Sequence, residues 1–132
     1  MRFMLDTNIC IYLINNKPQK ILTRFRKEDP GNIVLSSITL SELKFGAYNS
    51  SNIQRNLKAI SKFTAPLEVL PFSESATDIY GNIRASLKKA GKLIGPMDTL
   101  IAAHAISASC VLVTNNVKEF KKVKGLKLEN WA

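Results

Sequence analysis

Three acidic side chains lie at predicted boundaries between secondary-structure elements. Asp6 ends an apolar run, Glu42 is expected in the first turn of a helix, and Asp98 follows a Gly-Pro-Met sequence. A fourth polar residue, Asn116, comes just after another apolar run. Carboxylate and amide oxygens bind hard cations such as Mg²⁺, which also bind phosphate oxygens. Gathered around one ion in a basic chain, these residues predict a nuclease that hydrolyses phosphodiesters with metal-activated water.

The charge of the chain supports a polyanionic partner. There are 19 Lys and Arg residues against 10 Asp and Glu residues, which gives a net charge of +9. Excess positive charge attracts polyanions and speeds their encounter with the protein. The cationic residues cluster in 17–27, 84–92 and 118–127. A single cluster could simply be a solvated face that keeps the protein soluble. Three clusters together favour a polyanionic partner, which could be RNA, DNA or an acidic protein segment.

Length and composition restrict the class of protein. A chain of 132 residues that is 45% apolar suits one domain, spanning 1–132, with a single buried core. No apolar run reaches the roughly 20 residues that a membrane-spanning helix needs. No secretory signal is expected, so the cytoplasm is the predicted location. Cys10 and Cys110 lack metal-type spacing and are expected to be buried, reduced thiols.

Alternating strand and helix patterns predict the fold. Strands are expected over 1–5, 33–36, 67–70, 111–114 and 126–128, and helices over 9–14, 19–27, 37–48, 53–65, 76–90 and 96–109. This alternation predicts an α/β, single-domain, three-layer sandwich whose central, mainly parallel sheet has four to five strands flanked by helices. Ligands of open α/β sheets bind beyond the carboxyl ends of the strands. The acids and Asn116 are therefore expected to share one crevice.

Each acid also has a purely structural interpretation. Asp6 could cap the first helix, and Thr39 and Glu42 have the spacing of a capping box. Asp98, in a first turn, could interact only with the helix dipole. Three acids at one end of the sheet are nevertheless hard to attribute to capping alone. His104, the one histidine, falls on an apolar helix face and is expected in the core or at an interface.

Taken in order, the motifs of this chain resemble the PIN-domain ribonucleases, and within them the VapC toxins of bacterial toxin–antitoxin systems. The resemblance spans essentially the whole chain and is carried by Leu5-Asp6-Thr7-Asn8, Ser41-Glu42-Leu43 with Gly46, Gly95-Pro96-Met97-Asp98 with Ile101–Ala105, Val113–Asn116 with Glu119-Phe120, and the closing Gly125–Trp131. It implies a PIN-like fold and an endoribonuclease, dependent on Mg²⁺ or on Mn²⁺ in its place, that inhibits translation. It also implies a cognate antitoxin that blocks the active-site groove, a homodimer within a higher assembly, and contact with operator DNA only through the antitoxin.

The resemblance assigns roles residue by residue. The catalytic and metal-binding acids would be Asp6, Glu42 and Asp98. The small polar residues that support them would be Thr7, Asn8 and Thr114. The fourth acid of the family is commonly an aspartate, whereas this chain has Asn116, which keeps a neutral oxygen but loses a charge. That departure weakens the case for a second metal ion, and Glu119 is the alternative ligand there.

The substrate and two alternatives complete these expectations. The cations expected to contact RNA phosphates are Lys44, which lies close to Glu42 in the sequence, and Arg84 and Lys88, which share a face of the long helix. The family tends to cut structured RNAs such as transfer RNA in loops, which makes such an RNA the expected substrate. One alternative is a housekeeping RNA-processing nuclease of the same fold. The other is a non-catalytic basic module that binds RNA or protein, and Asn116 keeps that alternative open.

Overall fold

Five parallel strands form the centre of the computed structural model, which describes residues 1–132. The strands are β1 (Phe3–Leu5), β2 (Ile33–Ser36), β3 (Glu68–Leu70), β4 (Val111–Val113) and β5 (Leu128–Glu129). Their order is β3-β2-β1-β4-β5, and every neighbouring pair is parallel. Strands β1, β2 and β3 therefore follow one another toward one edge of the sheet. Strand β4 then pairs with the other side of β1, and β5 forms the opposite edge. Such a reversal places a ligand crevice beside β1 and β4, at their carboxyl ends.

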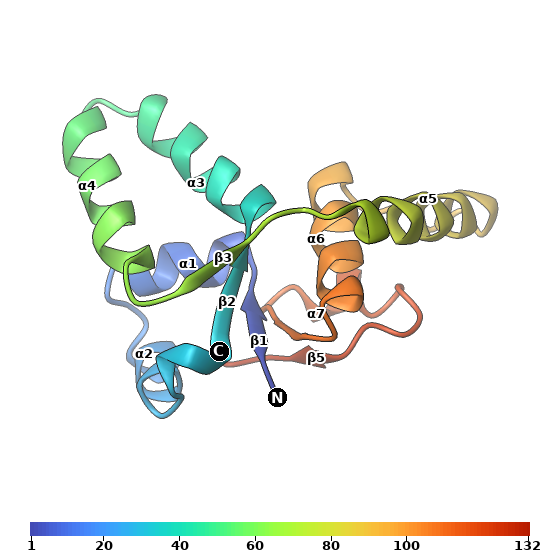
Figure 1. Cartoon of the computed structure of the whole chain (residues 1–132), viewed down its shortest axis with the longest axis horizontal. Coiled ribbons are helices and arrows are strands. Elements are labelled where there is room, and N and C mark those ends of the chain that lie inside the picture. Colours follow the sequence, from blue (N-terminus) through green and yellow to red (C-terminus); the bar gives the residue numbers. More distant parts are fainter.

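Helices cover both faces of this sheet (Figure 1). They are α1 (Thr7–Ile14), α2 (Gln19–Arg26), α3 (Ser37–Tyr48), α4 (Ile53–Thr64), α5 (Glu74–Lys89), α6 (Pro96–Ser107) and α7 (Val117–Phe120), with a 3₁₀ turn at Pro30–Asn32. The predicted elements are confirmed with small shifts at their ends. Helix α7 was not predicted, because four residues show no helical periodicity. None of the helices has both the length and the apolar character that crossing a bilayer requires.

Alternation along the strands creates two cores. Phe3 and Leu5 of β1 pack with α1, α2, α3 and α4, whereas Met4 between them packs with α5, α6 and α7. Strands β2 and β4 divide in the same way, with Val34 and Leu112 on the side of Met4. Because side chains alternate along a strand, a sheet covered by helices must be apolar on both faces. The predicted three-layer sandwich is therefore confirmed.

The start of α3 corrects one detail of the sequence analysis. The N-cap is Ser36, whose Oγ accepts a hydrogen bond from the backbone N–H of Ile38 at 3.0 Å. Thr39 lies inside the helix, fully buried, and its hydroxyl makes no hydrogen bond. The predicted capping box of Thr39 and Glu42 is therefore wrong. Glu42 lies in the second turn of α3, one turn later than predicted, because the helix begins directly at the end of β2.

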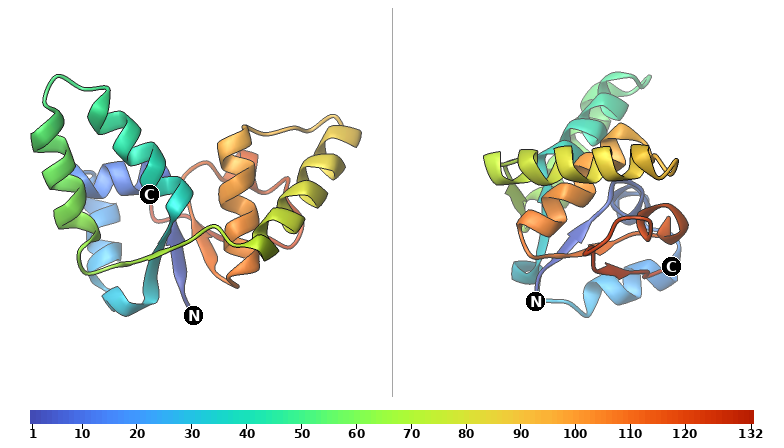
Figure 2. Two further views of the ribbon diagram at one scale, coloured as in Figure 1. Left: turned by 45° about the horizontal axis from the view of Figure 1, so that its top comes forward. Right: turned by 90° about the vertical axis from the view of Figure 1, so that its right-hand side faces the viewer.

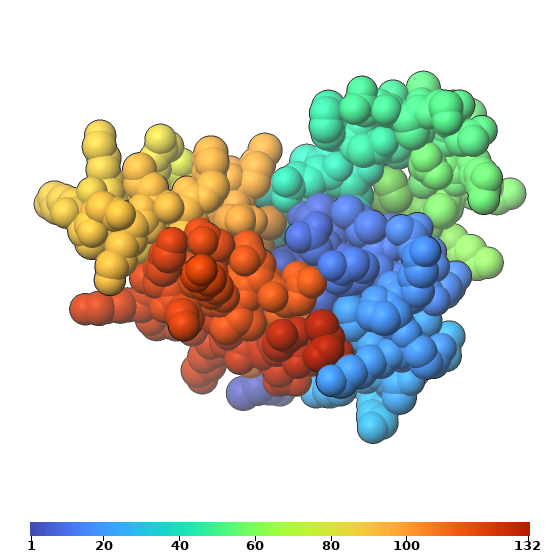
Figure 3. Space-filling model, turned by 180° about the vertical axis from the view of Figure 1, so that it is seen from behind, coloured from blue at the N-terminus to red at the C-terminus, as the bar shows by residue number.

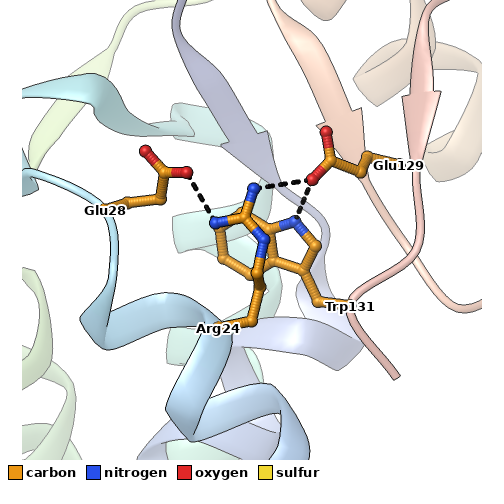
Figure 4. A network of polar contacts seen from close by, with 4 residues as sticks. All are labelled: Arg24, Glu28, Glu129 and Trp131. Atoms are coloured by element: carbon orange, nitrogen blue, oxygen red, sulfur yellow. Dashed lines mark hydrogen bonds and ion pairs between the residues drawn. The ribbon is translucent and has the colours of Figure 1, made fainter.

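Arg24 of α2 fastens the C-terminal residues to the body of the protein (Figure 4). Its guanidinium pairs with Glu28 and, at 2.8 Å, with Glu129 of β5. The indole N–H of Trp131 donates to the same Glu129 oxygen at 2.8 Å. The guanidinium also lies 4.7 Å from the centre of the Trp131 ring, which in turn packs edge-on against Phe3. Helix α2, the edge strand and the C-terminal tryptophan therefore stabilise one another.

Replacing Arg24 by alanine tests this network. We expect Arg24→Ala to lower the free energy of unfolding by about 1–2 kcal/mol, since it removes a stacked, partly exposed ion pair and leaves Glu129 with one partner. Urea denaturation measures the change. Arg26→Ala is the matched control, because Arg26 is exposed on the same helix and makes no ion pair. Equal losses in the two variants would contradict the stabilising role of the network.

Candidate active site

The acids predicted from the sequence come from all three layers of the fold. Asp6 directly follows β1 in the central sheet. Glu42 lies on α3, which packs on one face of the sheet, and Asp98 lies in the first turn of α6, on the other face. The two helices rise as separate arms on either side of the central strands (Figure 2). Seen from behind, an indentation separates the teal surface of α3 from the yellow-orange surface around the start of α6 (Figure 3).

Asp6 is a charged group held inside the protein. Its side chain is only 4% exposed, and its Oδ1 accepts the backbone N–H of Ile9 at 2.9 Å. The capping interpretation of Asp6 is thus confirmed, but capping does not explain the burial. Burial raises the pKa of Asp6 from 3.8 to about 6, against the opposing effects of the Thr114 hydroxyl and the Ile9 amide. The negative charges of Asp98 and Glu42 raise this pKa further.

Glu42 is positioned by the start of α1. The hydroxyl of Thr7, the first residue of α1, donates to Glu42 Oε1 at 2.7 Å. Thr7 follows Asp6 directly in the chain, so this hydrogen bond ties the Glu42 side chain to the end of β1. Asn8, the next residue, is exposed and its side chain makes no hydrogen bond. Of the two polar residues after Asp6, only Thr7 contacts another acid.

Asp98 completes the acidic group. It is half-buried, and burial is the main cause of its raised pKa, followed by the charges of Glu42 and Glu119. Glu119 lies on α7 and pairs loosely with Lys122, at 3.4 Å. The N-cap of α6 is Gly95, and no side chain caps this helix. Asp98 therefore raises the local negative charge without serving as a cap.

The residues after β4 line the neighbouring part of the crevice. Thr114 is fully buried, and its Oγ1 accepts the backbone N–H of Asn116 at 2.9 Å. Asn116 is the N-cap residue of α7, but its side chain caps no backbone amide. The side-chain amide of Asn116 is therefore not used for capping. It lies just after β4, where a weaker metal ligand was predicted.

The arrangement suits a hydrated cation. Carboxylate charges contribute to the raised pKa values of Asp6 and Asp98, but no three acidic, histidine or cysteine side chains lie close enough together to hold a metal ion as a group. Mg²⁺ uses one or two carboxylates and keeps several waters, so it needs no such group of three. An all-oxygen donor set with excess negative charge in a half-buried crevice fits that ion. The charge repulsion within the group is what a bound cation would relieve.

A buried contact that the sequence analysis missed links the arms that carry Glu42 and Asp98. His104 of α6 is 2% exposed, and its Nδ1 lies 2.7 Å from the Oγ of Ser36, the N-cap of α3. The ring of Phe72 packs edge-on against the imidazole, and burial lowers the pKa of His104. The predicted core position of His104 is confirmed, as are the buried free thiols of Cys10 and Cys110. The only signal for this contact was the serine at the end of β2.

The cations expected to contact phosphate lie outside this group. Lys44 is exposed on α3, two residues after Glu42. Arg84 and Lys88 are exposed on α5, one helical turn apart, and Arg84 donates to the Tyr80 hydroxyl at 2.7 Å. None of the three makes an ion pair with an acid of the site.

Comparisons with known proteins agree over the whole chain. The PIN domain model matches residues 3–126. The tRNA(fMet)-specific endonuclease VapC of Shigella flexneri is 44% identical over 132 residues, covering 100% of this chain and 99% of its own. Ribonuclease VapC2 of Haemophilus influenzae is 45% identical with the same coverage. The DNA-bound VapBC structure from Salmonella typhimurium has a TM-score of 0.94 at 44% identity, covering 100% of this chain and 99% of its own. For VapBC2 of Rickettsia felis, bound to a promoter DNA fragment, the TM-score is 0.92 at 41% identity, with both chains covered completely.

Without metal, the buried charge of Asp6 should cost stability at neutral pH. A pKa raised from 3.8 to about 6 means that the folded state binds the proton of Asp6 more tightly than the unfolded state does. The contribution of this proton to stability is therefore complete below pH 3.8 and is lost as pH rises through 6. The associated loss is at most about 3 kcal/mol by pH 7. We expect Asp6→Asn, which keeps an acceptor for the Ile9 amide, to be more stable than wild type at pH 7 in EDTA and to show a weaker pH dependence.

Thermal denaturation in EDTA between pH 5 and 8 measures this difference. Asp29→Asn is the matched control, because Asp29 also accepts a backbone N–H but is exposed. A stability difference between Asp6→Asn and wild type that does not grow with pH over this range, or an Asp6→Asn variant less stable than wild type at pH 7, would show that the burial of Asp6 carries no charge penalty.

Proposed function

This chain belongs to the PIN-domain family and is a VapC-type ribonuclease of a toxin–antitoxin pair, and from that premise we propose that it is an Mg²⁺-dependent endoribonuclease that cuts transfer RNA or another structured RNA. The observation that supports the site is the burial of Asp6 beside two further carboxylates, since burial and the charges of Asp98 and Glu42 raise the pKa of Asp6, and burial and the charges of Glu42 and Glu119 raise that of Asp98. We place the catalytic domain over 1–132 and its action in the cytoplasm. Cleavage of such an RNA would inhibit translation.

The carboxylates of Asp6, Glu42 and Asp98 would hold the ion, with Asn116 as a weaker neutral ligand. A bound Mg²⁺, or Mn²⁺ in its place, would lower the pKa of water and offset charge on the phosphoryl oxygens. Glu42 or Asp98 accepts the proton of the attacking water, since both are less buried than Asp6. The Ile9 amide and the Thr7 hydroxyl keep Asp6 and Glu42 oriented for this task.

Capping alone does not explain this set of acids. Asp6 is an N-cap, but Glu42 lies in the second turn of its helix and accepts a hydrogen bond from another helix. Asp98 caps no amide of α6. A non-catalytic module would have no reason to retain two such acids beside a buried third, since like charges close together destabilise the folded protein. This argues for the nuclease over the binding module.

The substrate follows from the relatives and from charge. The VapC proteins of Shigella flexneri and Salmonella typhimurium carry the name tRNA(fMet)-specific endonuclease. We propose a transfer RNA as the substrate here as well, drawn in by the net charge of +9. Lys44, Arg84 and Lys88 would contact its phosphates, which position the strand without reading its sequence.

We propose that the antitoxin covers an apolar groove bordered by Glu42. The groove encloses about 240 Å³ and is lined mainly by apolar side chains of α1, α3 and α4. Ile11 of α1, which lines the groove, is 40% exposed. An apolar antitoxin segment in this groove would reach Glu42 and block the site. Because related VapBC complexes were solved with promoter DNA, we expect this toxin to meet operator DNA only through its antitoxin, in an assembly built on a homodimer.

RNA cleavage tests the proposed chemistry. Asp98→Asn should lower the rate of transfer RNA cleavage at least about 100-fold, because it removes a charge from the ion site while leaving α6 uncapped as before. Gel electrophoresis of total transfer RNA with Mg²⁺ measures the products, and EDTA should abolish them. Asp78→Asn, an exposed acid on α5, is the control and should cleave like wild type. Products that persist in EDTA or in Asp98→Asn would exclude the proposed mechanism.

Filling the groove tests the antitoxin site. Gly46 lies in the groove lining, and a Cβ atom added there meets no atom within 4 Å. Gly46→Leu should therefore fold at least as stably as wild type, since leucine favours a helix over glycine, yet weaken antitoxin binding about tenfold or more. Gly81→Leu on α5 is the control, because Gly81 is equally open. Calorimetric titration with the antitoxin encoded beside the toxin measures both, and equal affinities would place the antitoxin elsewhere.

A further inference from the structure

The positive charge of the protein is concentrated in two short segments. Residues 84–92 and 117–127 together hold nine of the 19 cationic residues and one of the 10 acids. The rest of the chain holds ten cations and nine acids, and five of those cations lie in 17–27, directly before Glu28 and Asp29. Most of the net positive charge, and with it much of the attraction for a polyanion, therefore lies in the two segments.

The two segments meet at one cleft. A cavity of about 340 Å³ lies between the second half of α5 and the residues after α7, and no acid lines it. Buried Ile83, Leu87 and Val123 contribute apolar surface to it. Its polar lining residues, which together define the basic cleft, are Asn82, Ser86, Lys92, Lys122 and Lys124. In Figure 3 the yellow surface of α5 and the orange-red surface of residues after β4 adjoin on the same side of the molecule.

The cations of the basic cleft are available to a ligand. Lys92 and Lys124 are exposed, and their side chains make no hydrogen bond or ion pair. Lys122 has only the long contact with Glu119, at 3.4 Å. The hollow beside α2, which Lys20, Arg24 and Lys27 line, differs because Glu129 also lines it and pairs with Arg24. Free ammonium groups beside amide and hydroxyl donors suit phosphate and ribose oxygens.

The segments that form the basic cleft lie close along the chain to residues of the acidic site. Lys92 precedes Asp98 by six residues, and Lys122 lies one helical turn beyond Glu119, whose charge affects Asp98. A folded RNA whose cut strand lies at the acids thus meets the lysines as it extends away from them. Lysines act as point charges and read no sequence, so they would recognise the placement of a phosphate backbone.

We propose that the basic cleft is a second phosphate-binding site, which holds a part of the structured RNA substrate distant from the bond that is cut. The proposal rests on the ribonuclease function proposed above. A site of this kind contributes affinity for a whole folded RNA and little for a fragment that carries only the cut loop. It therefore selects for substrate size and shape.

The test compares two double variants with the same loss of charge. Lys92→Gln/Lys124→Gln alters the basic cleft and leaves Lys122 on Glu119, whereas Lys58→Gln/Lys62→Gln removes two exposed lysines of α4. Fluorescence anisotropy in EDTA measures binding to labelled transfer RNA and to an isolated stem-loop containing its cut site. We expect the cleft variant to bind transfer RNA about tenfold more weakly, with a log–log salt slope lower by about 1.5, and the α4 variant to change by about twofold or less. Both should bind the stem-loop, and cleave it with Mg²⁺, like wild type.

Three outcomes would overturn the proposal. Equal losses in both variants would mean that net charge alone matters, and unchanged binding in the cleft variant would mean that the cleft does not hold RNA. Normal RNA binding, with weaker promoter DNA binding by the toxin–antitoxin complex of the cleft variant, would assign the cleft to DNA. These outcomes can be told apart from a failure of the proposed ribonuclease function. In that case wild type would cleave neither the transfer RNA nor the stem-loop with Mg²⁺, whatever the binding measurements show.

Discussion

The burial of a carboxylate beside two others is the constraint on which the rest of the site depends. A carboxylate at the end of the central strand is taken out of water, and two more carboxylates are brought near enough to add to its cost. A protein selected for stability alone would separate these groups, since each raised pKa reports free energy lost when the group is charged. A cation bound among these carboxylates would offset the free energy lost on charging them, and this offset would contribute to its binding. The site is therefore stable only as a site for something positive.

The layered architecture makes that crowding depend on the whole molecule. Asp6 belongs to the sheet, Glu42 to a helix on one face, and Asp98 to a helix on the other. Two hydrogen bonds between distant segments fix the layers relative to one another, one from Thr7 to Glu42 and one between Ser36 and His104. A shift of either helical layer would separate the acids. The reversal of strand order beside β1 gives the crevice its place, and these contacts give it its geometry.

Much of this arrangement could be predicted from local pattern. Apolar runs and turn residues placed the strands, and alternation of strand and helix predicted a parallel sheet, which placed Asp6 and Asn116 at one edge. The turn that carries Glu42 was predicted wrongly, because the spacing from Thr39 mimics a capping box while packing buries Thr39 instead. The contact of Ser36 with His104 joins residues 68 positions apart, and no local pattern reports such a distance.

The basic cleft could likewise be predicted only in part from the sequence. The clusters at 84–92 and 117–127 are plain in the sequence, but their meeting at one cleft is not, because a helix and a strand separate them along the chain. Only the packing of α5 against the segment after α7 reveals it. In both cases the sequence specified the chemical groups, whereas tertiary packing decided which of them meet.

Calorimetric titration with Mn²⁺ tests the shared ion most directly. We predict that wild type binds the ion with measurable heat at pH 7, and that Asp6→Asn, Glu42→Gln and Asp98→Asn each weaken binding about tenfold or more, because each removes one charge from the same group. Asp78→Asn, which removes an exposed acid of α5 outside this group, should bind as wild type does. If the three site variants bound Mn²⁺ as tightly as wild type, the acids would not share an ion, and the account of this protein as a metal-dependent nuclease would fail.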